Sequence, residues 1–111
     1  MTSASLRLIE AAEAELIQET FLAIRAMHEA ATYGSDGEDM DGLDVRVRVL
    51  ISDDAESYEA DFASGSPQYD QDHRGYWGSG WVCSHADDVD LTSLAREMVA
   101  EVIDAVATDV N

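Results

Sequence analysis

The stretch from Asp44 to Ser52 constrains the fold most strongly, because its side chains alternate in character with a period of two. Successive side chains of a strand point to opposite faces of a sheet, so this period predicts a β-strand with one buried face. The buried face consists of the aliphatic residues Val45, Val47, Val49 and Ile51. Such a strand is stable only when further strands pair with it and another layer covers its apolar face.

A second strand is expected at residues 57–63, which alternate in the same way. A tight turn of two aspartates would join it to the first strand and set Arg48 opposite Glu59. The same register sets Arg46 opposite Asp61. Opposite charges at cross-strand positions contribute about 0.2–1 kcal/mol per pair. We therefore assign these two arginines to the sheet rather than to a binding site.

The single proline of the chain ends the second strand. A third strand is expected after it, at residues 75–83. Gly78 and Gly80 alternate with larger side chains there and leave one face of the strand almost bare. We expect a helix of the same chain to pack closely on this face. The lone cysteine, Cys83, ends the strand, and we interpret it as a small buried thiol. A single cysteine is also typical of a reducing cytoplasm.

Two amphipathic helices are expected to flank the strands. Apolar side chains recur every three to four residues over residues 5–32 and again over residues 91–107, as on a helix with one buried face. Glu10 and Glu13 fall inside or beside the apolar arc of the first helix, where they would overhang the core, meet a partner or lie in frayed turns. An acidic loop at residues 35–42 follows this helix.

The order of these elements predicts the α+β class. We expect one domain, residues 1–111, folded as a two-layer α-β-β-β-α sandwich. A three-stranded antiparallel sheet would form one layer, with two helices on one of its faces. The fold itself does not specify a function.

The charge of the chain limits its possible partners. Twenty-four acidic residues face six basic residues, which gives a formal net charge of −18. Nucleic acids and anionic membranes require a positive surface, so direct binding to either is disfavoured. No run of apolar residues is long enough to span a membrane, and the N-terminus lacks the pattern of a signal peptide. A basic protein surface is the favoured partner, in the cytoplasm.

The motif Y-D-Q-D-H-R-G-Y-W-G-S at residues 69–79 is the densest group of aromatic and charged side chains. Its aspartates and Arg74 could fold a loop, and its aromatic residues could anchor a partner; both roles stay open. The motif resembles one found in short, poorly characterised acidic proteins of phages and their bacterial hosts, with a likeness that extends over residues 58–105. The resemblance implies no chemistry for individual residues. It implies a phage or mobile-element setting, in which small acidic proteins often inhibit host DNA-directed machinery.

We therefore expect a non-enzymatic inhibitor that binds the basic nucleic-acid-binding surface of a host defence complex, in the manner of an anti-CRISPR or anti-restriction protein that imitates DNA. Glu15 and Glu19 lie one helical turn apart, about 6 Å along the axis, so that both carboxylates can contact one surface. The residues expected to bind the partner are Glu15, Glu19, Glu29, Asp36, Glu38, Asp39, Asp41, Tyr69, Asp70, Asp72 and Tyr76. No cofactor or metal is expected, and a homodimer is permitted.

Two alternatives compete with this hypothesis. The absence of lysine and the excess of aspartate are also typical of a salt-adapted cytoplasmic protein, in which the acidity would have no role in binding or catalysis. A small metal-dependent enzyme could instead use Asp70, Asp72 and His73, which are competent ligands close together in the chain. Arg74 next to them would oppose a bound cation. Metal-dependent chemistry is therefore the weaker alternative.

Overall fold

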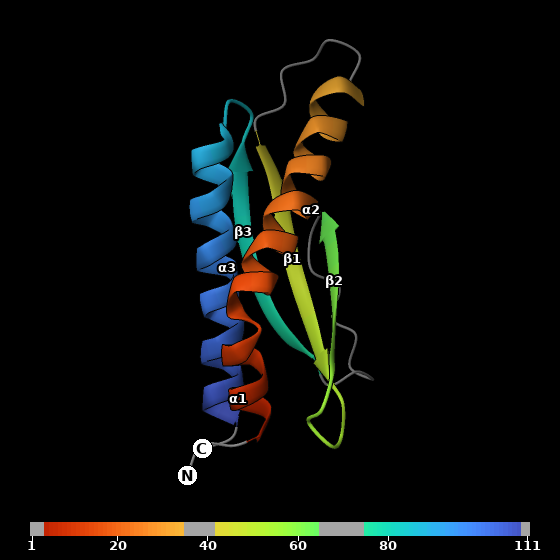
Figure 1. Cartoon of the computed structure of the whole chain (residues 1–111). Coiled ribbons are helices and arrows are strands. Elements are labelled where there is room, and N and C mark those ends of the chain that lie inside the picture. The colour runs from red at the N-terminus through yellow and green to blue at the C-terminus, as the bar shows by residue number, and fades with distance from the viewer. Residues whose placement is uncertain (1–3, 35–41, 65–74, 110–111) are drawn as a thin grey trace.

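The computed structural model describes residues 4–34, 42–64 and 75–109, the side chains of residues 32–34 excepted. Along the chain it forms α1 (Ala4–Ala11), α2 (Glu13–Gly34), β1 (Gly42–Ile51), β2 (Tyr58–Ser64), β3 (Tyr76–Cys83) and α3 (Asp88–Asp109). The strands form one antiparallel sheet, and the described helices lie together on one side of it (Figure 1). The predicted α+β class and its layers are thus confirmed.

The expected first helix is in fact two helices, because α1 ends at Ala11 and α2 begins at Glu13. The interruption is local: the amide of Ala12 donates to the carbonyls of both Leu8 and Ile9, at 3.1 Å each. Glu10 and Glu13 are exposed on either side of it. A continuous helix would place these two glutamates within or beside its apolar arc, so the break accompanies their release to solvent.

The sheet has the order β2-β1-β3, so that β1 is central and both other strands form edges. Val45, Val47 and Val49 are buried, as the alternation predicts. The register between β1 and β2 differs from the expected one: Arg48 lies opposite Asp61, and Arg46 lies opposite Ala63. The predicted pairs Arg48–Glu59 and Arg46–Asp61 are therefore wrong.

The turn between β1 and β2 explains this shift. The amide of Ser52 donates to the carbonyl of Ser57 at 3.0 Å, so the turn is centred one residue later than two aspartates alone would set it. A turn displaced by one residue moves every cross-strand partner by two. Ala55 adopts a left-handed conformation with φ of 57°, and the Ser52 hydroxyl donates to the Asp54 carboxylate at 2.7 Å. These local bonds hold the turn in place.

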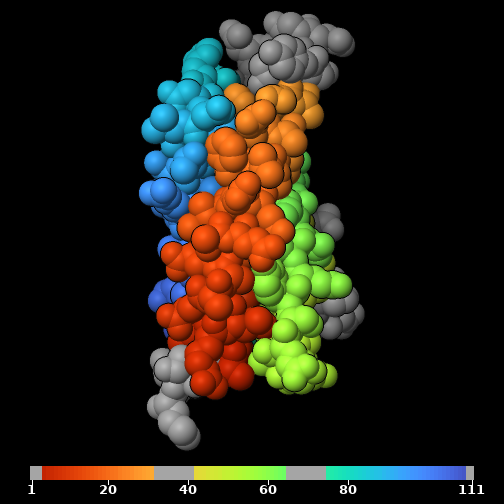
Figure 2. Space-filling model, in the orientation of Figure 1, coloured from red at the N-terminus to blue at the C-terminus, as the bar shows by residue number. Residues whose placement is uncertain are grey.

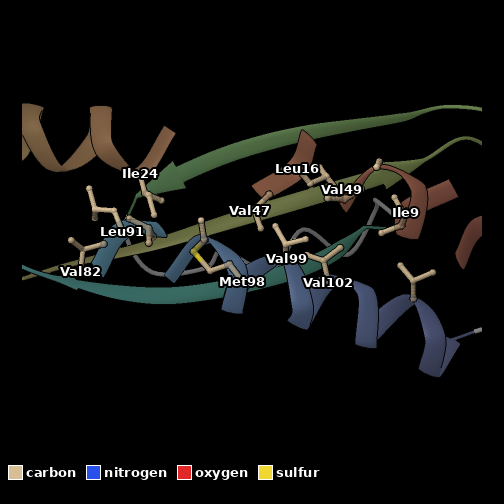
Figure 3. Close-up of a cluster of buried hydrophobic side chains, with 14 residues drawn as sticks. Ile9, Leu16, Ile24, Val47, Val49, Val82, Leu91, Met98, Val99 and Val102 are labelled. Carbon is tan, nitrogen blue, oxygen red and sulfur yellow. The ribbon is translucent and has the colours of Figure 1, made fainter. Parts of the chain in front are cut away.

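The core lies between the helices and the sheet (Figure 3). Ile9, Leu16 and Ile24 enter it from α1 and α2, and Met98 and Val102 enter it from α3; all five are nearly or fully buried. Burial of apolar surface is the main force that holds such a layer on a sheet. None of the helices within the described ranges is long and apolar enough to cross a membrane.

The strand β3 packs against α3 through its bare face, as predicted. A Cβ atom added to Gly78 would lie 2.2 Å from the carbonyl oxygen of Met98, so only glycine allows this approach of backbone to backbone. Cys83 lies on the other face of β3 and is exposed, which overturns the expectation of a buried thiol. The exposure of Cys83 follows from the alternation of side chains along the strand. Cys83 lies on the same face as Trp81, which is 55% exposed.

Candidate functional site

An open groove of about 680 Å³ separates the edge strand β2 from helices α1 and α2. We call it the acidic groove, because its described lining residues include five carboxylates and no arginine. Figure 2 shows β2 side by side with these helices along one flank of the molecule. The lining carboxylates belong to Glu15, Glu19, Glu56, Glu59 and Asp61, and the other lining residues are Leu8, Ser57, Tyr58 and Ala60.

Helix α2 supplies one wall of the acidic groove. Leu16, Thr20 and Ile24 point into the core and fix the rotation of the helix. Glu15 and Glu19 precede two of these buried residues, and the helical period turns both glutamates toward β2. They remain exposed. The sequence therefore brings two of the predicted partner-binding residues together on one wall.

The strand β2 and the turn before it supply the other wall. Because β2 is an edge strand, side chains from both of its faces border the groove. Glu59 and Asp61 alternate with Tyr58 and Ala60, and all four line the groove. Glu56 joins them from the turn. These three acidic residues were not among the predicted binding residues. The assumed register placed two of them, Glu59 and Asp61, in cross-strand ion pairs.

Tyr58 connects the two walls. Its hydroxyl donates a hydrogen bond to the Glu15 carboxylate at 3.0 Å. Burial raises the pKa of Tyr58 to about 12, and the hydrogen bond and negative charges of Glu15 and Glu19 act in the same direction. The phenol is therefore neutral at physiological pH and leaves the charge of the groove to the carboxylates.

The two arginines of β1, Arg46 and Arg48, do not line the acidic groove. Arg46 and Arg48 extend over the ring of Trp77, at 5.0 and 5.5 Å from its centroid, on the sheet face that the helices do not cover. Arg48 also donates to the Asp61 carboxylate at 2.6 Å. This pair compensates one of the five carboxylates. The other four make no ion pair with a residue that the structure describes.

The remaining predicted binding residues lie elsewhere. Glu29 is exposed on α2 and pairs with Arg25 at 3.5 Å. The Tyr76 hydroxyl donates to the Asp109 carboxylate at 2.6 Å, which ties β3 to the end of α3. Neither residue lines the acidic groove. The other predicted binding residues lie outside the described residues, and these are Asp36, Glu38, Asp39, Asp41, Tyr69, Asp70 and Asp72.

The metal alternative concerns three residues of the motif at residues 69–79. His73 lies outside the described residues together with Asp70 and Asp72. Within residues 4–34, 42–64 and 75–109, no group of three or more histidine, cysteine, aspartate or glutamate side chains has the geometry to hold a metal ion. The described carboxylates that line the acidic groove do not form such a group.

Comparison with known proteins gives no match to a protein family, to a curated protein or to a solved structure. The function must therefore be inferred from the geometry and charge of the molecule. The acidic groove is the described feature in which predicted binding residues of α2 lie near further carboxylates of β2 and the preceding turn.

Proposed function

We propose that this protein is a non-enzymatic inhibitor that binds a basic, nucleic-acid-binding surface through its acidic groove. One observation supports the proposal: five carboxylates from α2, β2 and the preceding turn line a single groove, and no arginine is among its described lining residues. The carboxylates would occupy the positions that phosphates take on such a surface. The resemblance of residues 69–78 to phage-type proteins favours a host defence complex as the target, in the cytoplasm.

Electrostatics explains how such a protein would compete with nucleic acid. A formal net charge of −18 accelerates association with a positive surface, because long-range attraction steers the encounter. The groove then sets the register, because its carboxylates come from both the helix wall, with Glu15 and Glu19, and the strand wall, with Glu59. Binding should weaken steeply as salt is added, with a Debye length of about 10 Å at 0.1 M.

The proposal can be tested with two variants that lose the same charge. The groove variant carries Glu15→Gln, Glu19→Gln and Glu59→Gln. The control variant carries three neutralising substitutions at exposed carboxylates outside the groove, namely Glu10→Gln, Asp44→Asn and Glu97→Gln. Their affinities for a fluorescent nonaarginine peptide are compared with wild type by anisotropy.

We expect the groove variant to bind at least about tenfold more weakly than wild type, which corresponds to about 1.4 kcal/mol. The control variant should lose no more than about threefold. Equal losses in both variants would show that net charge alone attracts the peptide, and the groove would then have no specific role. Thermal unfolding from about 0.05 M to about 3 M KCl distinguishes the proposed inhibitor from a salt-adapted protein. A salt-adapted chain would fold only at molar salt, because screening removes the repulsion between its own charges.

A further inference from the structure

A second groove lies between α2 and α3, on the outer side of the helical layer, where Figure 2 shows these helices side by side. We call it the interhelical groove; it measures about 610 Å³. Its apolar lining includes Ala14, Ile17, Ala100, Ile103 and Ala107. The small side chains of the alanines leave room above the two isoleucines, and both isoleucines are partly exposed.

The charge of the interhelical groove contrasts with that of the rest of the molecule. Two carboxylates, Glu13 and Asp104, and one arginine, Arg96, line it. Arg96 is exposed and forms no ion pair with any residue in the described part of the chain. The groove is therefore nearly neutral on a chain with a net charge of −18, and it presents a cation available to a partner's carboxylate.

The spacing of the charges along α3 identifies that partner. Arg96 precedes Ala100 by four residues, and Asp104 follows it by four, so each lies about 6 Å from Ala100 along the axis and on a similar face of the helix. A two-fold axis that passes beside Ala100, midway between two antiparallel copies of α3 and perpendicular to both, would exchange these positions. The Arg96 guanidinium of each copy would then meet the Asp104 carboxylate of the other.

We propose that the interhelical groove binds a second copy of this chain, with the two α3 helices packed antiparallel and crossing at Ala100. A two-fold interface must be complementary to itself, and the order Arg96–Ala100–Asp104 has this property. Alanine at the crossing point allows the helix axes to approach to about 8 Å, near the lower end of the usual range. The isoleucines of the two copies would bury their exposed surface against each other.

This proposal is independent of the proposed function. The acidic groove lies on the β2 side of α2, and the interhelical groove lies on its α3 side. A dimer of this kind would leave both acidic grooves open to a basic partner. Two strongly negative chains repel each other elsewhere, so the nearly neutral groove is the favourable place for their contact.

A charge exchange tests the two-fold geometry. The variants are Arg96→Asp, Asp104→Arg and the double variant, and self-association is measured by sedimentation velocity at 0.15 M NaCl from about 5 µM to about 500 µM. We expect each single variant to raise the dimer dissociation constant at least about tenfold, which is about 1.4 kcal/mol. The double variant should return to within about threefold of wild type, because its charges are merely exchanged across the axis.

Controls separate pairing from net charge. Arg7→Asp and Asp53→Arg make the same charge changes at exposed positions outside both grooves and should change self-association by less than about threefold. Arg96→Asp and Asp104→Arg shift the net charge in opposite directions. If overall repulsion alone controlled self-association, one of these variants would dimerise more strongly than wild type and the other more weakly. That outcome would overturn the proposal, as would a wild-type monomer over the whole concentration range or a double variant as weak as the singles. Circular dichroism verifies that each variant is folded.

Cross-linking gives a second readout. In a Cys83→Ser background, Ala100→Cys places a thiol beside the proposed axis, where the two Cα atoms come within disulfide range. Mild oxidation should yield a covalent dimer within minutes, whereas Ala26→Cys, exposed on α2 outside both grooves, should remain mostly monomeric. Equal rates for the two cysteines would contradict the proposed crossing point.

Discussion

Gly78→Ala should destabilise the protein far more than Gly80→Ala, although the glycines lie two residues apart on the same face of β3. At Gly78 an added Cβ would lie 2.2 Å from the Met98 carbonyl oxygen and 2.9 Å from its carbonyl carbon. Both atoms belong to the backbone of α3, so the whole helix would have to move away from the sheet. At Gly80 the nearest atom, at 2.4 Å, is the Cδ1 of Leu94, whose partly exposed side chain can rotate aside.

The expected magnitudes follow from this difference. Overpacking against an immovable neighbour costs about 1–3 kcal/mol. The gain from replacing a strand glycine by alanine is smaller, about 0.5–1 kcal/mol. We therefore expect Gly78→Ala to lower the free energy of unfolding by about 2 kcal/mol and Gly80→Ala to change it by less than about 1 kcal/mol.

Urea denaturation monitored by tryptophan fluorescence measures both values, with the slope m verifying that the unfolded states are comparable. Equal stability of the two variants would refute the conclusion that α3 rests directly on the backbone of β3. Gly75→Ala serves as a further control, because its nearest contacts, at 3.0 to 3.3 Å, are flexible side-chain atoms of Arg48 and Leu50.

Three further predictions concern the turn and the acidic groove. The raised pKa of Tyr58, about 12, favours its neutral form in the folded state, so its contribution to stability is complete below pH 10 and is lost as the pH rises through 12. In alkaline denaturation, the Tyr58→Phe variant should lack this loss of stability. Identical pH profiles of wild type and variant would contradict the assignment. Asp61→Asn should cost less than about 1 kcal/mol in thermal unfolding, because its pair with Arg48 is largely solvent-exposed on the carboxylate side, and a loss above about 2 kcal/mol would contradict that estimate. Ala55→Gly should stabilise the fold by up to about 1 kcal/mol in urea, because glycine adopts the φ of 57° without steric cost, and a destabilised variant would show that this turn conformation is wrong.

Much of the fold could be predicted from the sequence, because its signals are periodic. The alternation at residues 44–52 identified the central strand and its buried valines, and the glycines of β3 identified the surface on which a helix rests. The register of β2 could not be predicted from the same signals. It depends on the Ser52–Ser57 hydrogen bond, and a turn moved by one residue changes every cross-strand pair.

The candidate site was predicted in part. Helical periodicity placed Glu15 and Glu19 on one exposed side of α2, but it could not indicate which strand lies beside them. Glu59 and Asp61 were assigned to ion pairs, and only the position of β2 at the edge of the sheet brings them to the groove. The break at Ala12 had a visible signal in the glutamates at positions 10 and 13, because they interrupt the apolar arc.

Competition with nucleic acid tests the proposed function most directly. A DNA-binding nuclease of a bacterial defence system is bound to fluorescent duplex DNA, and the wild-type protein, the groove variant and the control variant are each titrated against the complex. The acidic groove predicts that wild type and control displace the DNA at similar concentrations, whereas the groove variant requires at least about tenfold more. Displacement by all three at the same concentration, or by none across a panel of such nucleases, would contradict the proposed function.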